Sequence, residues 1–296
     1  MMRVLYKSLA LLVVTELIST SAIAVEPSLS LCTGSKTGTY FPVGEMIATQ
    51  AKGVLTVNVV ETKGSADNLK KLKDKTCQAA IVQADAYFAE EDTQVRSALK
   101  LEQTATLYDE YVHLICNRES GVSGVGDLED YPDKYTLLVG VKGSGSALTW
   151  RSFGLLDEDY SKVPTLPIGE GRALAQLVEG REAQCLLYIG GLNSDTMKSF
   201  NAQGDKLKLV PVDDGDFDNK TDQLGKRIYH FTKIPSGTYD KLQSGFFSSS
   251  VTTLAVQAVV VTDKTWIEAN SDAYNDFVTA VFDATPHIKR LVTGNK

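Results

Sequence analysis

The sequence predicts an α/β protein of two similar lobes, with mostly parallel sheets, joined by hinge strands. From Leu29 onward, short apolar runs alternate with amphipathic stretches, which is typical of strands alternating with helices. The same order of elements occurs twice along the chain. Without residues 1–24 the 296-residue chain has 272 residues, a length that suits one large domain or two lobes that each have a core of their own, and we favour two lobes.

The first 24 residues have the pattern of a secretory signal. Arg3 and Lys7 give a positive start, an apolar run follows, and Ala22-Ile23-Ala24 offers a small-residue cleavage site. Glu16 interrupts the apolar run, whereas a membrane anchor needs about 20 uninterrupted apolar residues. We therefore assign residues 1–24 to a signal peptide that is removed, and we expect an exported protein.

The first lobe opens with two strand-loop-helix units. Pro42 near the first turn, and Val43, Ile47 and Ala51 on one face, indicate a helix directly after a glycine loop. Gly64-Ser65 opens a second helix. We expect strands at residues 29–33, 55–60 and 79–82.

A second series follows the apolar strand at residues 112–116. Gly143 to Ser146 opens a helix, and Leu174 and Leu177 mark another. Strands are expected at residues 136–141, 166–168 and 185–189. Both series contain a glycine-serine loop and a cysteine just before the final strand, which favours two similar lobes.

The rest of the chain returns to the first lobe. A turn-rich acidic stretch at 213–222 precedes an apolar strand at 254–261, and an apolar stripe from Trp266 to Phe282 predicts a final helix that ends at Pro286. We expect the crossing strands near residues 110–117 and between residues 229 and 252. The predicted division is residues 25–112 for the first lobe, 113–235 for the second, and 236–296 for the return.

Charge and cysteine content limit the possible partners. The net charge of −7 carries no long block of one sign, which argues against nucleic acid and anionic membranes. Cys32, Cys77, Cys116 and Cys185 allow three complete disulfide pairings in an oxidising compartment, and buried free thiols are the alternative. No cysteine or histidine spacing predicts a metal site, and no cofactor is expected.

Two glycine-serine loops, Gly34–Gly38 and Gly143–Ser146, each stand between a strand and a helix. Such loops direct free backbone N–H groups and the positive end of a helix at an anion. A cleft between the lobes would then hold a carboxylate or phosphate from both sides. The alternative is that the glycines only let the chain turn.

An enzyme is not expected. The first loop lacks the Gly-Lys-Ser/Thr ending of a P-loop, and the second lacks the third glycine of a dinucleotide fingerprint. The three histidines are scattered, and no serine lies in a nucleophile elbow.

Five strings, in order, resemble the TAXI family of TRAP transporter receptors: TGSKTGTYFPVG from Thr33, ETKGSADNL from Glu61, IVQAD from Ile81, VKGSGSA from Val141 and IPSGTYDK from Ile234. The resemblance implies a type II periplasmic binding protein fold and a monomeric periplasmic receptor. It further implies a small-molecule ligand, a carboxylate such as glutamate or 2-oxoglutarate, delivered to TRAP membrane permease subunits. An ABC importer, a sensor or a bulkier apolar ligand is the alternative.

The motif matches imply ligand contacts at Gly38, Thr39, Tyr40, Gln83, Gly143, Ser144, Gly145, Ser146 and Tyr188, with Asp85 nearby. For the tyrosines, packing in a core is the alternative. After the second loop the family commonly has threonine and arginine, where this chain has Ala147 and Leu148. That departure argues against strong charge pairing to a carboxylate.

Overall fold

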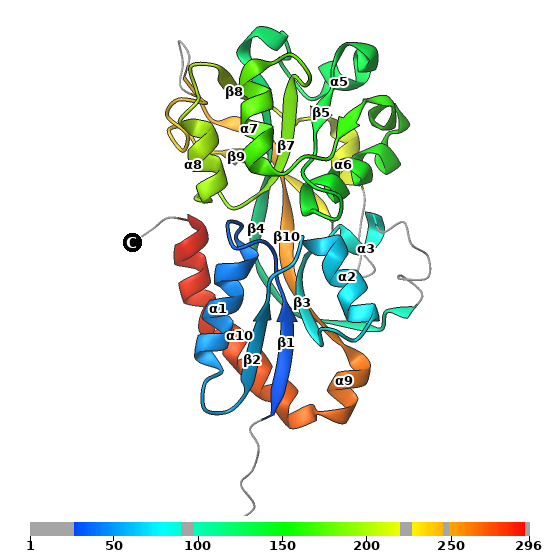
Figure 1. Ribbon diagram of the computed structural model, residues 1–296, viewed down its shortest axis with the longest axis vertical. Helices are drawn as coiled ribbons and strands as arrows, with labels where there is room; N and C mark the ends of the chain where they lie inside the picture. The colour runs from blue at the N-terminus through cyan, green and yellow to red at the C-terminus, as the bar shows by residue number, and fades with distance from the viewer. Residues whose placement is uncertain (1–26, 90–97, 220–226, 245–248, 294–296) are drawn as a thin grey trace, which may run out of the picture.

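The computed structural model describes residues 27–89, 98–219, 227–244 and 249–293, so the predicted signal peptide lies outside the described residues. Figure 1 shows two lobes stacked along the long axis of the molecule. The strands β4 (Leu101–Asn117) and β10 (Val251–Asp263) run through both lobes. No helix of the described residues is long and apolar enough to cross a membrane.

The first lobe, at the bottom of Figure 1, is built on three parallel strands in the order β2-β1-β3, with β10 antiparallel to β3. Helices cover the strands on both sides. Its elements are β1 (Ser28–Cys32), α1 (Tyr40–Gln50), β2 (Thr56–Val60), α2 (Ser65–Lys73), β3 (Ala79–Gln83), α3 (Ala86–Ala89), α9 (Lys264–Ala269) and α10 (Ser271–Thr293).

The second lobe continues the same sheet as β4-β7-β5-β6, with β8 on β4 and β9 on β10. Its elements are α5 (Gly126–Asp130), β5 (Leu137–Leu138), α6 (Gly145–Leu156), β6 (Thr165–Leu166), α7 (Glu170–Glu179), β7 (Cys185–Gly190), α8 (Asp195–Asn201), β8 (Leu207–Val210) and β9 (Tyr229–Ile234). Short 3-10 helices occupy Arg118–Ser120, Pro132–Lys134, Glu158–Lys162 and Gly215–Asn219.

The sheet is mixed, not mostly parallel as predicted. The outer strands pair in parallel, but β4 and β10 run antiparallel to each other and to every other strand they pair with. The apolar runs that predicted parallel pairing are equally typical of these central strands, because both of their faces are covered.

Apolar cores lie on both faces of the sheet in each lobe. Along β3, Ile81 packs under α1 and α10, while Val82 packs on the side of α2. Along β7, Leu187 and Tyr188 likewise enter different cores. Successive side chains of a strand point to opposite faces, so one buried strand serves two cores.

The chain crosses between the lobes within β4 and β10. Residues 101–111 of β4 pair with β10, and from Tyr111 onward β4 pairs with β7. After β9, Tyr239 and Leu242 still belong to a core of the second lobe. This is later than the predicted return at residue 236, and we propose that the return lies within β10.

The C-terminal helix differs from its prediction. Two helices, α9 and α10, replace the single one, and Pro286 lies inside α10, which continues to Thr293. Buried Ile288 and Val292 hold the last turns against the first lobe. Phe282, predicted for the apolar stripe, is 76% exposed. Proline removes the hydrogen bond to the carbonyl four residues earlier, which is that of Phe282, on this exposed side where water reaches the carbonyl.

The structure pairs Cys32 with Cys77 and Cys116 with Cys185. The first disulfide joins the end of β1 to Cys77, which lies just before β3, and the second joins directly opposed residues of β4 and β7. Each lobe therefore contains one disulfide, and the sequence had left the pairing open.

Candidate functional site

A cavity of about 80 Å³ lies where the two lobes meet. The first lobe contributes the loop from Gly34 to Tyr40, the start of α2, and Gln83 at the end of β3. The second lobe contributes the start of α6, Glu170 of α7, Thr196 of α8, and the end of β7. Glu110 of the crossing strand β4 completes the wall. The cavity is far smaller than the roughly 300–1,000 Å³ of pockets for drug-sized ligands.

Four helices of the described chain begin at this cavity: α7 does so with the acidic Glu170, and the other three with uncharged residues. The first residues of α1, α2 and α6, which are Tyr40, Ser65 and Gly145, all line it. The first N–H groups of a helix have no acceptor inside the helix, and the helix dipole places partial positive charge at that end. Three such ends from two lobes make the cavity suited to a negatively charged group.

Glycine at position 64 lets the two lobes approach closely. Its φ of 117° is in the region that favours glycine, and a Cβ there would lie 3.3 Å from the backbone nitrogen of Gly145. A Cβ on Gly145 would in turn lie 1.7 Å from Oε1 of Gln83. The lobes are thus in contact across the cleft, backbone against backbone.

Eight of the nine residues expected at the ligand line this cavity: Gly38, Thr39, Tyr40, Gln83, Ser144, Gly145, Ser146 and Tyr188. Gly143 lines a neighbouring groove of about 460 Å³ along α6. Some of these side chains also accept hydrogen bonds from backbone N–H groups and so stabilise the local structure. The hydroxyl of Ser144 accepts from the N–H of Ala147 at 3.2 Å, and that of Ser146 from the N–H of Ile189 at 3.1 Å.

Glu110 is a cavity residue that the sequence did not suggest. It is 4% exposed, and its Oε2 accepts a hydrogen bond of 2.5 Å from the Tyr40 hydroxyl. Burial raises the pKa of Glu110 to about 8; the bond from Tyr40 opposes this rise and the charge of Asp85 adds to it. The only sequence signal was an acidic residue at the start of an apolar strand.

A buried hydrogen-bond network joins the lobes beside the cavity. Oδ2 of Asp85 accepts from the hydroxyls of Thr149 at 2.7 Å and Tyr229 at 2.5 Å, and the Gln83 amide donates to Thr149 at 3.0 Å. Gln83 ends β3 and Asp85 follows it in the first lobe, whereas Thr149 and Tyr229 belong to α6 and β9. Burial raises the pKa of Asp85 to about 6, although the hydrogen bonds from the Tyr229 and Thr149 hydroxyls act to lower it.

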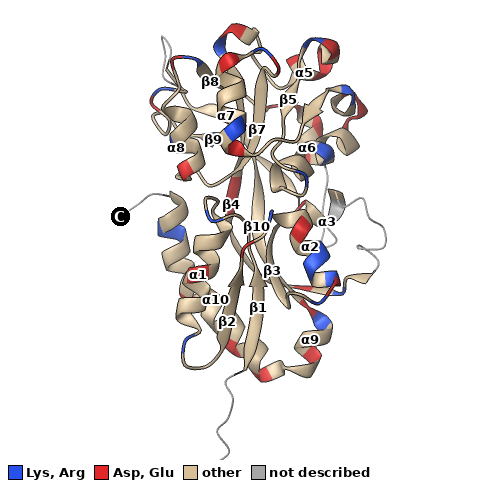
Figure 2. Cartoon of the chain, viewed as in Figure 1, with Lys and Arg blue, Asp and Glu red and all other residues tan. Residues whose placement is uncertain are grey.

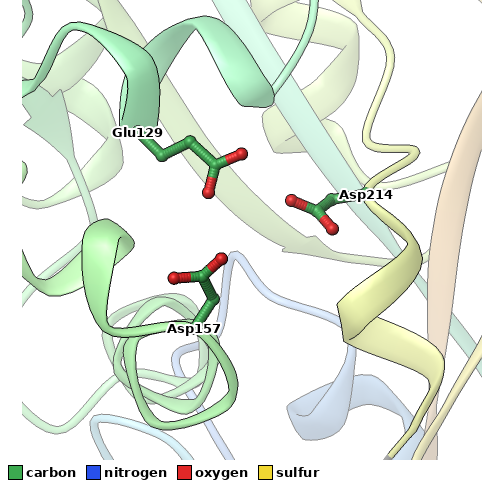
Figure 3. A group of neighbouring side chains, drawn as sticks. All are labelled: Glu129, Asp157 and Asp214. Atoms are coloured by element: carbon green, nitrogen blue, oxygen red, sulfur yellow. The ribbon is translucent and has the colours of Figure 1, made fainter.

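Away from the cleft, Glu129, Asp157 and Asp214 form an acidic cluster in the second lobe, shown in Figure 3. One carboxylate oxygen of each lies within 4.8 Å of the others, close enough to share a cation. Asp214 also accepts from the Tyr160 hydroxyl at 2.7 Å. Burial and the two neighbouring carboxylates raise the pKa of Glu129 to about 7. Proximity alone does not assign a metal, since protonation of Glu129 relieves the repulsion as well.

Figure 2 shows acidic and basic residues interspersed over both lobes, in line with the net charge of −7.

The model of the NMT1-like family matches residues 31–293, almost the whole described chain. Solved structures with a similar fold include the alkanesulfonate-binding protein SsuA from Xanthomonas axonopodis pv. citri bound to MOPS. It has 15% sequence identity and a TM-score of 0.52, covering 92% of this chain and 76% of that one.

Two further structures show the same architecture. The GluR0 ligand-binding core from Nostoc punctiforme, in complex with L-glutamate, has 12% identity and a TM-score of 0.51, covering 89% of this chain and 98% of that one. A ligand-binding component of an ABC-type import system from Staphylococcus aureus, with zinc bound, has 11% identity and a TM-score of 0.50. The match covers 91% of this chain and 79% of that one. The predicted type II periplasmic binding protein fold is confirmed.

Proposed function

Because this chain belongs to the NMT1-like family of periplasmic solute-binding proteins, we propose that it captures a small organic acid between its lobes. The acid is a carboxylate of the size of glutamate or 2-oxoglutarate. The protein delivers it, without chemical turnover, to membrane transporter subunits. The signal-like residues 1–24 support a location in the periplasm.

One observation carries the proposal: the N-termini of α1, α2 and α6 meet at a single cavity. Backbone N–H groups from two lobes recognise an anion only when the lobes are together, so binding and closure are linked. The volume of about 80 Å³ argues against the bulkier apolar ligand in this closed arrangement.

The partner is proposed from the sequence motifs. Their resemblance to TAXI receptors supports TRAP permease subunits, whereas the structure from Staphylococcus aureus is a component of an ABC-type import system. Uptake of labelled ligand into vesicles that contain the candidate membrane subunits distinguishes a TRAP transporter from an ABC importer. Uptake driven by an ion gradient supports the TRAP assignment, and uptake that requires ATP contradicts it.

A thermal-shift screen of organic acids, sugars, phosphonates and lipids tests the ligand class. At a ligand concentration 100-fold above Kd, linkage predicts about 2.7 kcal/mol of stabilisation, which raises Tm clearly. We expect shifts with small carboxylates. Shifts confined to sugars or lipids would remove the basis for an anion site.

A further inference from the structure

The cavity holds a buried acidic group of its own, which an organic acid alone does not explain. Glu110 is 4% exposed and lines the same small space as the N-termini of α1, α2 and α6. Of the other charged residues in the described wall, Glu170 is half-buried and Lys63 is exposed. The most deeply buried titratable carboxyl group of the cavity wall is therefore Glu110.

The hydrogen bonds of Glu110 leave one oxygen for a ligand. Tyr40 donates to Oε2 and so orients the carboxylate, whereas Oε1 has no hydrogen-bond partner among the described residues. Glu110 also stands where β4 changes its neighbour from β10 to β7, on the axis between the lobes. Oε1 is accessible from the cavity, so a donor on a bound ligand can reach it.

A purely anionic ligand either leaves Glu110 protonated or places a second negative charge beside the ionised carboxylate, where like charges repel strongly in a space of low dielectric constant. A ligand that carries a cation next to its carboxylate avoids this repulsion. Its carboxylate meets the helix N-termini, and its cation meets Oε1 of Glu110.

We propose that Glu110 binds the ammonium group of the ligand, so that this receptor takes α-amino acids in preference to the corresponding 2-oxo acids. The inference rests on the proposed function, because it deepens the same site. Of glutamate and 2-oxoglutarate, which differ only in the amino and oxo groups, the proposal favours glutamate.

The ionisation of Glu110 gives the proposal a pH signature. The titratable groups around it are Tyr40 from α1, Tyr108 on β4, Asp85 after β3 and Tyr188 from β7, with Lys63 and Glu170 in the cavity wall. The pKa of Glu110 is raised to about 8, so an ammonium group must displace a proton below that pH. Affinity for an amino acid should rise about 10-fold per pH unit from pH 6 toward 8 and then level off. Affinity for a 2-oxo acid should instead fall above pH 8, where Glu110 is charged.

Calorimetry with matched pairs tests the assignment: L-glutamate with 2-oxoglutarate, L-leucine with 4-methyl-2-oxopentanoate, and L-alanine with pyruvate. For the pair that binds, the wild-type protein should favour the amino acid. Glu110→Gln should weaken the amino acid about 10- to 100-fold, the usual loss for a hydrogen bond to a charged group. The same variant should keep or improve binding of the oxo acid. Glu102→Gln, an exposed position on the same strand, is the control and should change neither.

Tyr40→Phe tests the positioning role of the tyrosine. Because the bond from Tyr40 lowers the pKa of Glu110, its loss should move the pH midpoint of amino-acid binding upward. A merely structural loss would weaken binding without moving the midpoint.

The outcomes separate this inference from the proposed function. A preference of the wild-type protein for the oxo acid, equal weakening of both ligands in Glu110→Gln, or an unmoved midpoint in Tyr40→Phe overturns the role of Glu110 while the organic-acid site stands. Failure of every pair to bind overturns the organic-acid proposal, and the ammonium site falls with it.

Discussion

At the scale of single residues, Gln83 has two tasks at once. It lines the cavity, and its amide donates to Thr149 across the lobe boundary while only 2% of the residue is exposed. Gln83→Ala removes both contacts. We expect affinity for the ligand to fall about 10-fold, since hydrogen bonds of this kind contribute about 0.5–1.5 kcal/mol, and more with a charged partner.

Calorimetry measures this change, and circular dichroism checks that the fold is kept. Gln103→Ala is the matched control, because Gln103 is an exposed glutamine on β4 whose side-chain amide donates to the hydroxyl of Thr106, away from the cavity. Unchanged affinity in Gln83→Ala would move the ligand away from the end of β3.

Asp85 gives a prediction of pH dependence. Its pKa rises from an ordinary 3.8 to about 6 on burial, so the folded state holds a proton that the unfolded state has already released between these values. The free energy of unfolding should therefore fall as pH rises from about 4 to 6. The fall amounts to as much as about 3 kcal/mol, at about 1.4 kcal/mol per pKa unit.

Urea titrations at several pH values check this dependence. In Asp85→Asn the free energy of unfolding should decrease less between pH 4 and 6, because an amide does not titrate. Asp74→Asn, at an exposed position, should show the same decrease as the wild-type protein. The contribution of Glu129 is common to all three proteins and cancels in the difference. Because the charge of Asp85 also raises the pKa of Glu110, the slopes are compared between pH 4 and 6, below the pKa of Glu110. Identical slopes for wild type and Asp85→Asn would contradict the role of Asp85.

Local patterns predicted part of the site and long-range pairing decided the rest. The glycine loops were visible because loop residues and their helix follow one another in sequence. Glu110 was not, since Tyr40 lies 70 residues away and only the pairing of β4 brings the two together. Asp85 appeared as a residue near the site, but its partners Thr149 and Tyr229 come from the other lobe.

At the scale of helices and strands, tertiary packing can override the local sequence signals for where a helix or strand begins and ends. The ten residues before Tyr111 in β4 are largely polar and did not predict a strand, yet they pair with β10 along their length. Pro286 predicted a helix end, yet α10 continues because its later turns are buried. The short β5 is the opposite case. Gly140, with φ of 76°, turns the chain soon after Leu138 and ends the predicted strand early.

The disulfides provide an element-scale prediction. They close segments of 45 and 69 residues, and the chain-entropy account gives each about 4 kcal/mol of stabilisation. Replacing Cys32 and Cys77, or Cys116 and Cys185, by serine should lower the free energy of unfolding by up to that amount. Guanidinium unfolding with and without dithiothreitol measures the effect.

All four cysteines are in these two bonds, so a variant with four serines is the control and should not respond to reductant. A wild-type midpoint that dithiothreitol leaves unchanged would show that the bonds do not contribute.

At the scale of the whole molecule, closure is the testable property. Small-angle scattering should show a smaller radius of gyration for the wild-type protein on saturation with ligand, because each lobe supplies part of the cavity. Gly145→Val should fold but fail to close, since even a Cβ at this position overlaps the buried Gln83 side chain.

Gly124→Val is the control in the same lobe, because a Cβ there meets no atom within 4 Å. It should bind and close like wild type. Normal closure of Gly145→Val would mean that the second glycine loop is only a turn.

The order in which the chain is synthesised has a consequence for the first lobe. Its strands β1 to β3 are made early, but β10 and α10, which pair with β3 and pack on α1, are made last. The second lobe is an insertion between these halves. During synthesis the second lobe can therefore fold before the last helix of the first lobe is made. A chain truncated before α10 should have a folded second lobe and no completed binding cavity.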